Sequence, residues 1–366
     1  MSRSDKMTRR QFLILVILFS IGSSILFIPS AAARDVKQGA WIPIVAGIGT
    51  GLLIVLLLMR VAHRYPDLTY VEINRRLLGK WMGTIVSVVS FVACYVLGAS
   101  TLVYYMGDFM TTQVMRTTPE YMIHIMFTLI VVMGLLLGLK TLAFTAEVLF
   151  PIVVVLFAAL IVFVSPKIQL EHFQPVFEAG ILPILKGVFS YMSYTSFPLV
   201  FFLMIYPSAV QGGMKASGAF LLGSFIGGMF LLIVTAACVG VLGAEQTARQ
   251  FYPSYALAKR INIANFITRI EVIVAAFWII ALYFKTVIYF YASVKGMAQL
   301  LKLDDERVLV IPLGLLMVPL SLFTYPSSAY QLQWDEKVWP VYSITIGLLF
   351  PLLLVAAGAF RKKIKP

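Results

Sequence analysis

Two charged residues, Glu147 and Lys285, lie inside long apolar stretches of this sequence. A charge at the centre of a bilayer costs at least about 2.5 kcal/mol, so it usually faces a partner or a water-filled cavity. If the two residues lie at similar depth, they can form an ion pair that only fixes how the helices pack. In the functional interpretation, Lys285 holds the place of a coupling cation, or Glu147 takes up a proton when the pair opens. In a third arrangement, Lys285 extends to the polar surface and leaves Glu147 protonated.

Small and polar residues interrupt two other apolar stretches. The first stretch contains Gly22, Ser23 and Ser24. Glycine costs about 1 kcal/mol in a helix and serines compete for backbone hydrogen bonds, so an unwound turn is predicted; alternatively, the small residues only let a neighbouring helix approach. The second interruption spans residues 191–198, where Pro198 leaves the carbonyl of Tyr194 without its helical donor.

The two interruptions together indicate a binding site. A half-helix that begins near Ser24 directs its N–H groups at an anionic group, and the free carbonyl of Tyr194 accepts from an ammonium or hydroxyl group. An amino acid, or another small zwitterion, fits such a pair. The candidate ligand-binding residues are Gly22, Ser23, Ser24, Tyr194, Thr195, Phe197 and Leu199, with Tyr95 and Trp278 as further candidates for the pocket wall.

Other site chemistries are not supported by the sequence. The histidines His63, His124 and His172 are far apart, and Cys94 and Cys238 each lie in an apolar run. No catalytic dyad, metal cluster or disulfide framework is predicted from them. We therefore expect a protein that is not an enzyme and that needs no cofactor or metal ion.

The elements that must position these residues are membrane helices. Of 366 residues, 60% are hydrophobic and 12% are charged, against about 25% charged residues in soluble domains. Because one span takes about 20 apolar residues, nearly the whole chain is needed for spans. We predict an all-α integral membrane protein with a single transmembrane domain over residues 1–366. Its ten spans are residues 11–33, 40–62, 81–106, 121–139, 141–164, 187–208, 216–242, 270–294, 308–325 and 338–360.

Charge distribution predicts the orientation of these spans. Lys and Arg number 18 on the side of both termini and 10 on the other side, with Lys285 inside a span. The positive-inside rule therefore places both termini in the cytoplasm. The net charge of +13 lies in short clusters between apolar runs, which argues against a nucleic-acid partner. The outer segment 243–269 is expected to lie flat on the outer surface.

The two interruptions occupy corresponding places in the two halves of the chain. Each lies in the first span of its half, with repeat one at about residues 10–164 and repeat two at about 187–360. Paired broken helices of this kind indicate a central site in a transporter-type fold. We therefore predict a five-plus-five inverted repeat in which helices 1 and 6 are broken.

Several short motifs in this order resemble the B subunit of bacterial spore germinant receptors. They are residues 21–25, 147–151, 202–207, 252–253, 269–271 and 278–280. That family is part of the amino acid, polyamine and organocation transporter superfamily, whose fold is the same inverted repeat. The resemblance implies a sensor in the inner membrane of the spore that works with an A subunit and a lipoprotein C subunit. It also implies amino acids, sugars or nucleosides as ligands.

The chain departs from many of these relatives at one point. Where they carry an acidic residue in the sixth span, it has Phe197, Pro198 and Leu199, so the resemblance supplies no carboxylate for an ammonium group. The leading hypothesis is a ligand-binding receptor subunit for a small nutrient, most simply an amino acid. The alternative is an active amino-acid transporter, proton-coupled through Glu147.

Overall fold

The computed structural model describes residues 6–176, 178–260 and 271–364, and within them every named element is helical. The first half contains α1 (Arg9–Ile21), α2 (Ser24–Val36), α3 (Trp41–Arg64), α4 (Tyr70–Leu78), α5 (Lys80–Ala93), α6 (Thr101–Phe109), α7 (Glu120–Leu136) and α8 (Leu139–Val164). The second half contains α9 (Ile181–Tyr194), η7 (Phe197–Met204), α10 (Ser217–Leu242), α11 (Ala244–Arg249), α12 (Pro253–Lys259), α13 (Glu271–Leu301), α14 (Val310–Phe323), α15 (Ser328–Lys337), α16 (Trp339–Ile344) and α17 (Phe350–Ile364). Short π-helical segments join α5 to α6 (Cys94–Ser100) and α16 to α17 (Thr345–Leu349).

The helices have the length and composition of a multi-pass membrane protein, as predicted. Among the described residues, eight helices are long and apolar enough to cross a membrane, and the bent pair α1 and α2 makes a ninth. The remaining predicted segment contains α7, a shorter apolar helix of 17 residues. The predicted first residue of the eighth span, Ile270, lies outside the described residues. The count of ten spans stays a prediction.

Both predicted interruptions are present. A capping box formed by Thr8 and Gln11 starts α1, which ends at Ile21. After Gly22 and Ser23 the chain continues as α2 in a direction that differs by 46°. In the second half α9 ends at Tyr194, and after two residues the chain continues as the tighter 3-10 helix η7, with Pro198 near its start. Proline supplies no N–H for a regular α-helix at this point.

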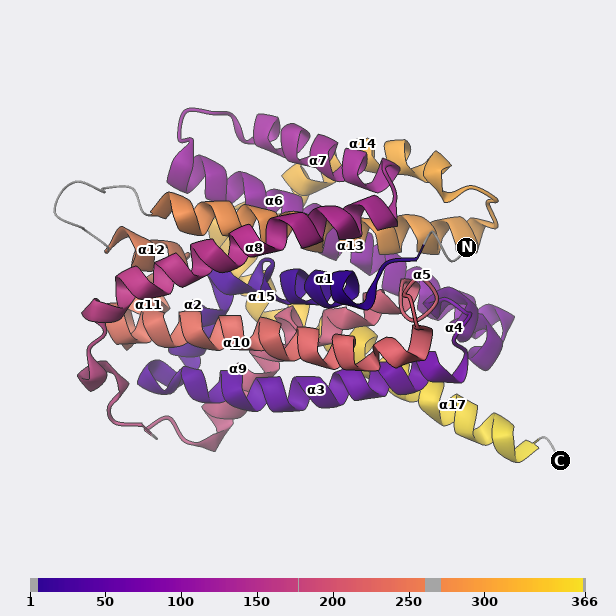
Figure 1. Ribbon diagram of the computed structural model, residues 1–366, viewed down its shortest axis with the longest axis horizontal. Helices are drawn as coiled ribbons and strands as arrows, with labels where there is room; N and C mark the ends of the chain where they lie inside the picture. Colours follow the sequence, from indigo (N-terminus) through magenta and orange to yellow (C-terminus); the bar gives the residue numbers. More distant parts are fainter. Residues whose placement is uncertain (1–5, 177, 261–270, 365–366) are drawn as a thin grey trace.

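The broken helices lie in the interior of the bundle. In Figure 1, α1 begins and α17 ends toward the same end of the molecule, whereas α11 and α12 lie at the opposite end. The broken first span of each half packs against the second span of the other half: α1 contacts α10, and α9 contacts α3. In the 18-residue apolar stretch that contains α9, 83% of the residues are buried, whereas only 22% are buried in the corresponding stretches of α8 and α14. The latter two therefore form part of the rim.

The outer segment differs from its predicted place. In the part that the structure describes, Leu257 on α12 is fully buried, and the hydroxyl of Tyr252 donates a hydrogen bond to Asp108 on α6. The side of α12 that carries Leu257 therefore packs into the end of the bundle, while Lys259 and Arg260 are exposed, as expected for its polar side. The rest of the predicted segment, residues 261–269, lies outside the described residues.

Candidate ligand-binding site

The side chain of Lys285 on α13 joins the two helix breaks. Its Nζ donates hydrogen bonds to the carbonyl oxygen of Tyr194 (2.9 Å) and to Oγ of Ser24 (3.3 Å). Ser24 Oγ itself donates to the Tyr194 carbonyl over 3.2 Å. The last residue of α9 and the first residue of α2 therefore share one ammonium group.

The groups that contact the Lys285 ammonium are neutral. It is 2% exposed, and its Nζ lies 5.3 Å from the centre of the Phe19 ring. Within the described residues, no carboxylate forms an ion pair with it. In transporters with broken helices, unwound backbone carbonyls coordinate the coupling cation. The Lys285 ammonium thus has the surroundings of such a cation.

Gly22 makes room for the Lys285 side chain. A Cβ atom on Gly22 would lie 2.3 Å from Cδ and 2.9 Å from Cβ of Lys285, well inside van der Waals contact. Both interpretations of Gly22 drawn from the sequence therefore apply at once, because the helix is interrupted here and a neighbouring helix also approaches closely.

A small cavity adjoins the Lys285 side chain. Its volume is about 20 Å³, counted as the space open to the centre of a water molecule, which holds about one water. A molecule larger than water therefore fits only if the walls move. The polar and charged part of the wall comes from Ser23, Thr101, Tyr105, Tyr194, Lys285, Tyr289, Tyr325, Asp335 and Trp339.

Asp335 on α15 is the charged wall residue that sequence reasoning missed. It is 6% exposed; the Tyr105 hydroxyl donates to its carboxylate, 2.9 and 2.8 Å from the two oxygens, and Gln331 Nε2 donates over 3.3 Å. Burial raises the pKa of Asp335, which lies between two candidate spans, to about 7, and the hydrogen bonds from Tyr105 and Gln331 oppose this rise. Because α15 is a polar connection, a search for charges inside apolar stretches passes over it. The one sequence signal is the four-residue spacing of Gln331 and Asp335 on one helix face.

A second cavity of about 20 Å³ lies next to the first, beside Phe251, and shares Tyr194 and Asp335 with it. Arg34 and Glu336 line this second cavity and form an ion pair of 3.0 Å between α2 and α15. Movement of the shared side chains would join the two cavities. The second cavity is thus a candidate entrance to the first.

Glu147 does not pair with Lys285, so one of the arrangements open from the sequence is wrong. Its Oε1 lies 3.3 Å from Nε of Arg10, and its Oε2 accepts a hydrogen bond of 2.9 Å from Gln11 Nε2. Both partners belong to the first turn of α1. Position along a helix predicts the depth of a side chain but not the face on which it lies, and depth alone had suggested the pair. Glu147 instead fastens α8 to the start of α1.

Three predicted residues of the sixth span lie apart from the Lys285 cavity. The Thr195 hydroxyl donates to the carbonyl of Tyr191 over 2.8 Å. Phe197 lines a separate, mostly apolar cavity, and Leu199 is fully buried in η7. The cavity wall from this span is supplied by Tyr194.

Tyr95 and Trp278, which were predicted to line the pocket from outside the broken helices, also lie away from the Lys285 cavity. Tyr95 donates its hydroxyl hydrogen to the carbonyl of Leu313, and the Trp278 ring packs 4.5 Å from that of Phe109. Neither residue belongs to the wall of the Lys285 cavity. Among the predicted ligand contacts, the structure brings together Gly22, Ser23, Ser24 and Tyr194 around Lys285.

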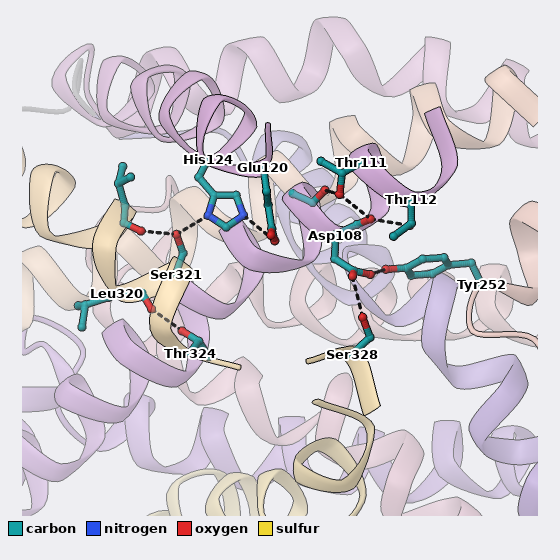
Figure 2. A network of polar contacts seen from close by, with 12 residues as sticks. Asp108, Thr111, Thr112, Glu120, His124, Tyr252, Leu320, Ser321, Thr324 and Ser328 are labelled. Carbon is teal, nitrogen blue, oxygen red and sulfur yellow. Dashed lines mark hydrogen bonds and ion pairs between the residues drawn. The ribbon is translucent and has the colours of Figure 1, made fainter. Parts of the chain in front are cut away.

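Figure 2 shows two polar groups that hold the helices around this site. Asp108 on α6 accepts hydrogen bonds from Tyr252, which precedes α12, and from Ser328 at the start of α15 (2.9 Å). These bonds fasten α15, and with it Asp335, to α6.

The second group contains one of the three histidines. His124 on α7 lies 2.9 Å from Ser321 Oγ and 3.4 Å from Glu120. Serine, histidine and carboxylate are the components of a hydrolase triad, but Ser321 is fully buried and donates its hydroxyl hydrogen to the carbonyl of Val318. The group links α7 to α14 and presents no accessible nucleophile.

Comparison with known proteins shows the family and the fold of the chain. A family model described as spore germination protein matches residues 6–329. Spore germination protein KB of Bacillus subtilis (strain 168) is 28% identical over 363 residues, which cover 97% of this chain and 95% of that protein. Spore germination protein YndE of the same organism is 25% identical and is covered over 99% of both chains.

Among solved structures, Mhp1, a nucleobase-cation-symport-1 family transporter in a closed conformation with bromovinylhydantoin bound, is similar with a TM-score of 0.67. The match covers 97% of this chain and 76% of Mhp1 at 12% identity, so it shows the fold alone. The fold is that of a membrane transporter, and the resemblance found in the sequence is confirmed: the chain belongs to the spore germination protein family.

Proposed function

We propose that the chain is the ligand-binding subunit of a spore germinant receptor and that it senses a small nutrient, most simply an amino acid. The observation that carries the proposal is the Lys285 ammonium, which binds Tyr194 and Ser24 at the two helix breaks beside a small cavity. In transporter folds, breaks at this place mark the substrate site. Membership of the spore germination protein family supplies the biological context.

We also infer ten transmembrane helices in a five-plus-five inverted repeat. The tenth span is α7, whose 17 residues are short but apolar. The reciprocal packing of α1 with α10 and of α9 with α3 supports a two-fold relation between the halves. The broken helices then lie near the bilayer midplane.

A tethered cation favours a sensor over a carrier that is coupled to a free metal cation. A free coupling ion must leave its site in every transport cycle, whereas the Lys285 ammonium is covalently attached. A sensor needs only one ligand-stabilised state that partner subunits can detect. The alternative, a proton-coupled amino-acid transporter, is favoured by Glu147, since protonation of its carboxylate would weaken its contacts with Arg10 and Gln11 at the start of α1.

The expected partners and location follow from this function. We propose that the chain works with an A subunit and a lipoprotein C subunit in the inner membrane of the spore. Similarity to spore germination proteins KB and YndE supports a role in such a complex. The excess of Lys and Arg on the side of the termini supports cytoplasmic chain ends.

The orientation can be tested with reporter fusions in a bacterial inner membrane. Alkaline phosphatase fused to the C-terminus is expected to be inactive, and a green fluorescent protein at the same place is expected to fluoresce. As the matched control, alkaline phosphatase fused after Glu178, in the connection between α8 and α9, is expected to be active. An active C-terminal phosphatase would contradict the orientation.

Sensor and carrier are separated by reconstitution. The chain alone in liposomes is expected to bind labelled amino acid saturably without accumulating it in the lumen, because a sensor does not have to open to the second side. Germination in response to the same compound is expected to require the A and C subunits. Uptake by the isolated chain that is lost in Gly22→Leu would contradict the sensor and support the transporter.

A further inference from the structure

Two opposite charges face the same cavity, and neither has a counter-ion. Lys285 and Asp335 both line it, at 2% and 6% exposure. Neither takes part in an ion pair with any residue that the structure describes. The hydrogen-bond partners of Lys285 are carbonyl and hydroxyl oxygens, and those of Asp335 are the neutral donors of Tyr105 and Gln331. Since an unpaired buried charge is costly, each charge would gain from a ligand group of opposite sign.

We propose that Asp335 binds the ammonium group of the ligand and so selects zwitterionic amino acids over carboxylates that lack an amine. The inference rests on the proposed function, because it assigns one end of the ligand in that site. The ligand carboxylate then lies toward Lys285 and the start of α2, where a cation and a helix N-terminus both attract an anion. The residue that sets specificity is thus on α15, outside the broken helices.

The position of Asp335 between the two cavities fits this role. It forms part of the wall of the cavity that holds Arg34 and Glu336 and of the cavity that holds Lys285. A ligand that enters through the cavity lined by Arg34 and Glu336 meets Asp335 before it reaches Lys285. No counter-ion has to be displaced, because the carboxylate is held only by neutral hydrogen-bond donors.

The test measures ligand-induced thermal stabilisation of the purified full chain in nanodiscs with a panel of proteinogenic amino acids, sugars and nucleosides. Each active amino acid is compared with its deaminated analogue, such as L-alanine with propionate. We expect the analogue to bind at least about tenfold more weakly, since it loses a charged hydrogen bond. In Asp335→Asn, affinity for the amino acid is expected to fall about tenfold to a hundredfold and to approach that of the analogue. The control is Glu336→Gln, which removes the neighbouring carboxylate paired with Arg34 and should preserve the discrimination.

Each outcome decides something. Unchanged discrimination in Asp335→Asn would overturn the role of Asp335 and leave the proposed function intact. Stabilisation by sugars or nucleosides alone, if it is lost in Gly22→Leu, would also overturn the role of Asp335 and leave the proposed function intact. Stabilisation by no compound of the panel would overturn the proposed function and this inference with it.

A measurement on the wild type keeps the inference testable if Asp335→Asn does not fold. With a pKa of about 7, Asp335 is mostly ionised at pH 8 and mostly protonated at pH 6, and an ammonium group binds the ionised form. The ratio of L-alanine to propionate affinity should therefore fall about tenfold from pH 8 to pH 6.

Other titratable groups do not change this ratio. Lys285 faces the carboxylate that both ligands carry, so any change in its charge alters both affinities alike. The tyrosine hydroxyls near Asp335 stay protonated in this pH range. The groups that face Asp335 are Tyr105, Tyr194, Tyr325, Lys285, Arg34 and Glu336. A ratio that does not change with pH would overturn the inference.

Discussion

Replacing Gly22 by leucine is expected to abolish ligand binding while the protein still accumulates in the membrane. A Cβ at this position would lie 2.3 Å from Cδ of Lys285, so the lysine side chain has to leave its place between Tyr194 and Ser24. Leucine also favours helix over the interrupted turn that glycine permits. Loss of the shared ammonium and of the turn removes both polar ends of the two broken helices from the site. Thermal stabilisation by the nutrient panel measures the effect, and membrane protein levels show that the chain is still made.

The same substitution on a neighbouring helix provides the control. Gly49 on α3 is exposed, and a Cβ placed there has no atom within 4 Å. Gly49→Leu is therefore expected to accumulate and to bind as the wild type does. Normal binding by Gly22→Leu, at normal protein level, would show that α1 and α2 are not part of the binding site. The contact of Lys285 with the two helix breaks would then no longer support the proposed function.

The membrane helices and their interruptions could be predicted from the sequence because the signals are local. Long apolar runs identify the spans, and Gly22, Ser23 and Pro198 weaken or remove backbone hydrogen bonds at their own positions. The structure shows both interruptions within one or two residues of the predicted places. Four of the predicted ligand contacts, Gly22, Ser23, Ser24 and Tyr194, consequently lie together around Lys285.

Which side chains meet across helices could not be predicted in the same way. Glu147 and Lys285 were placed at similar depth, but depth does not give the rotation of a helix about its axis. In the structure Glu147 faces α1 and Lys285 faces the helix breaks. Asp335 was missed for a different reason, since it belongs to a polar connection that folds back into the bundle. The hydrogen bonds from Tyr105 to Asp335 and from Ser328 to Asp108, together with the ion pair of Glu336 with Arg34, hold it there.

Replacing Lys285 by methionine is expected to weaken ligand binding by about a hundredfold or more, since it removes a buried charge that faces the ligand carboxylate. Protein level should stay near that of the wild type. The exchange replaces a buried ammonium that has no counter-ion by an apolar chain of similar length, and Ser24 Oγ still donates to the Tyr194 carbonyl. Lys295→Met on the same helix is the control, because Lys295 donates to the Tyr291 hydroxyl and does not line the cavity.

Combining Lys285→Met with Glu147→Gln tests whether the two intramembrane charges act separately, as their contacts indicate. Glu147→Gln removes the ion pair with Arg10 but keeps a side-chain oxygen that can accept from Gln11, so its own effect on binding should be small. The two residues share no hydrogen-bond or ion-pair partner in the part of the chain that the structure describes. The effects of the two substitutions on the melting temperature should therefore add, and their effects on the free energy of binding should add within about 0.5 kcal/mol. Recovery of binding or stability in the double variant would show that Glu147 and Lys285 neutralise each other in another conformation of the protein. That result would make the pair part of a transport or signalling cycle, whereas additivity leaves Lys285 as a residue of the binding site and Glu147 as a contact that holds the start of α1.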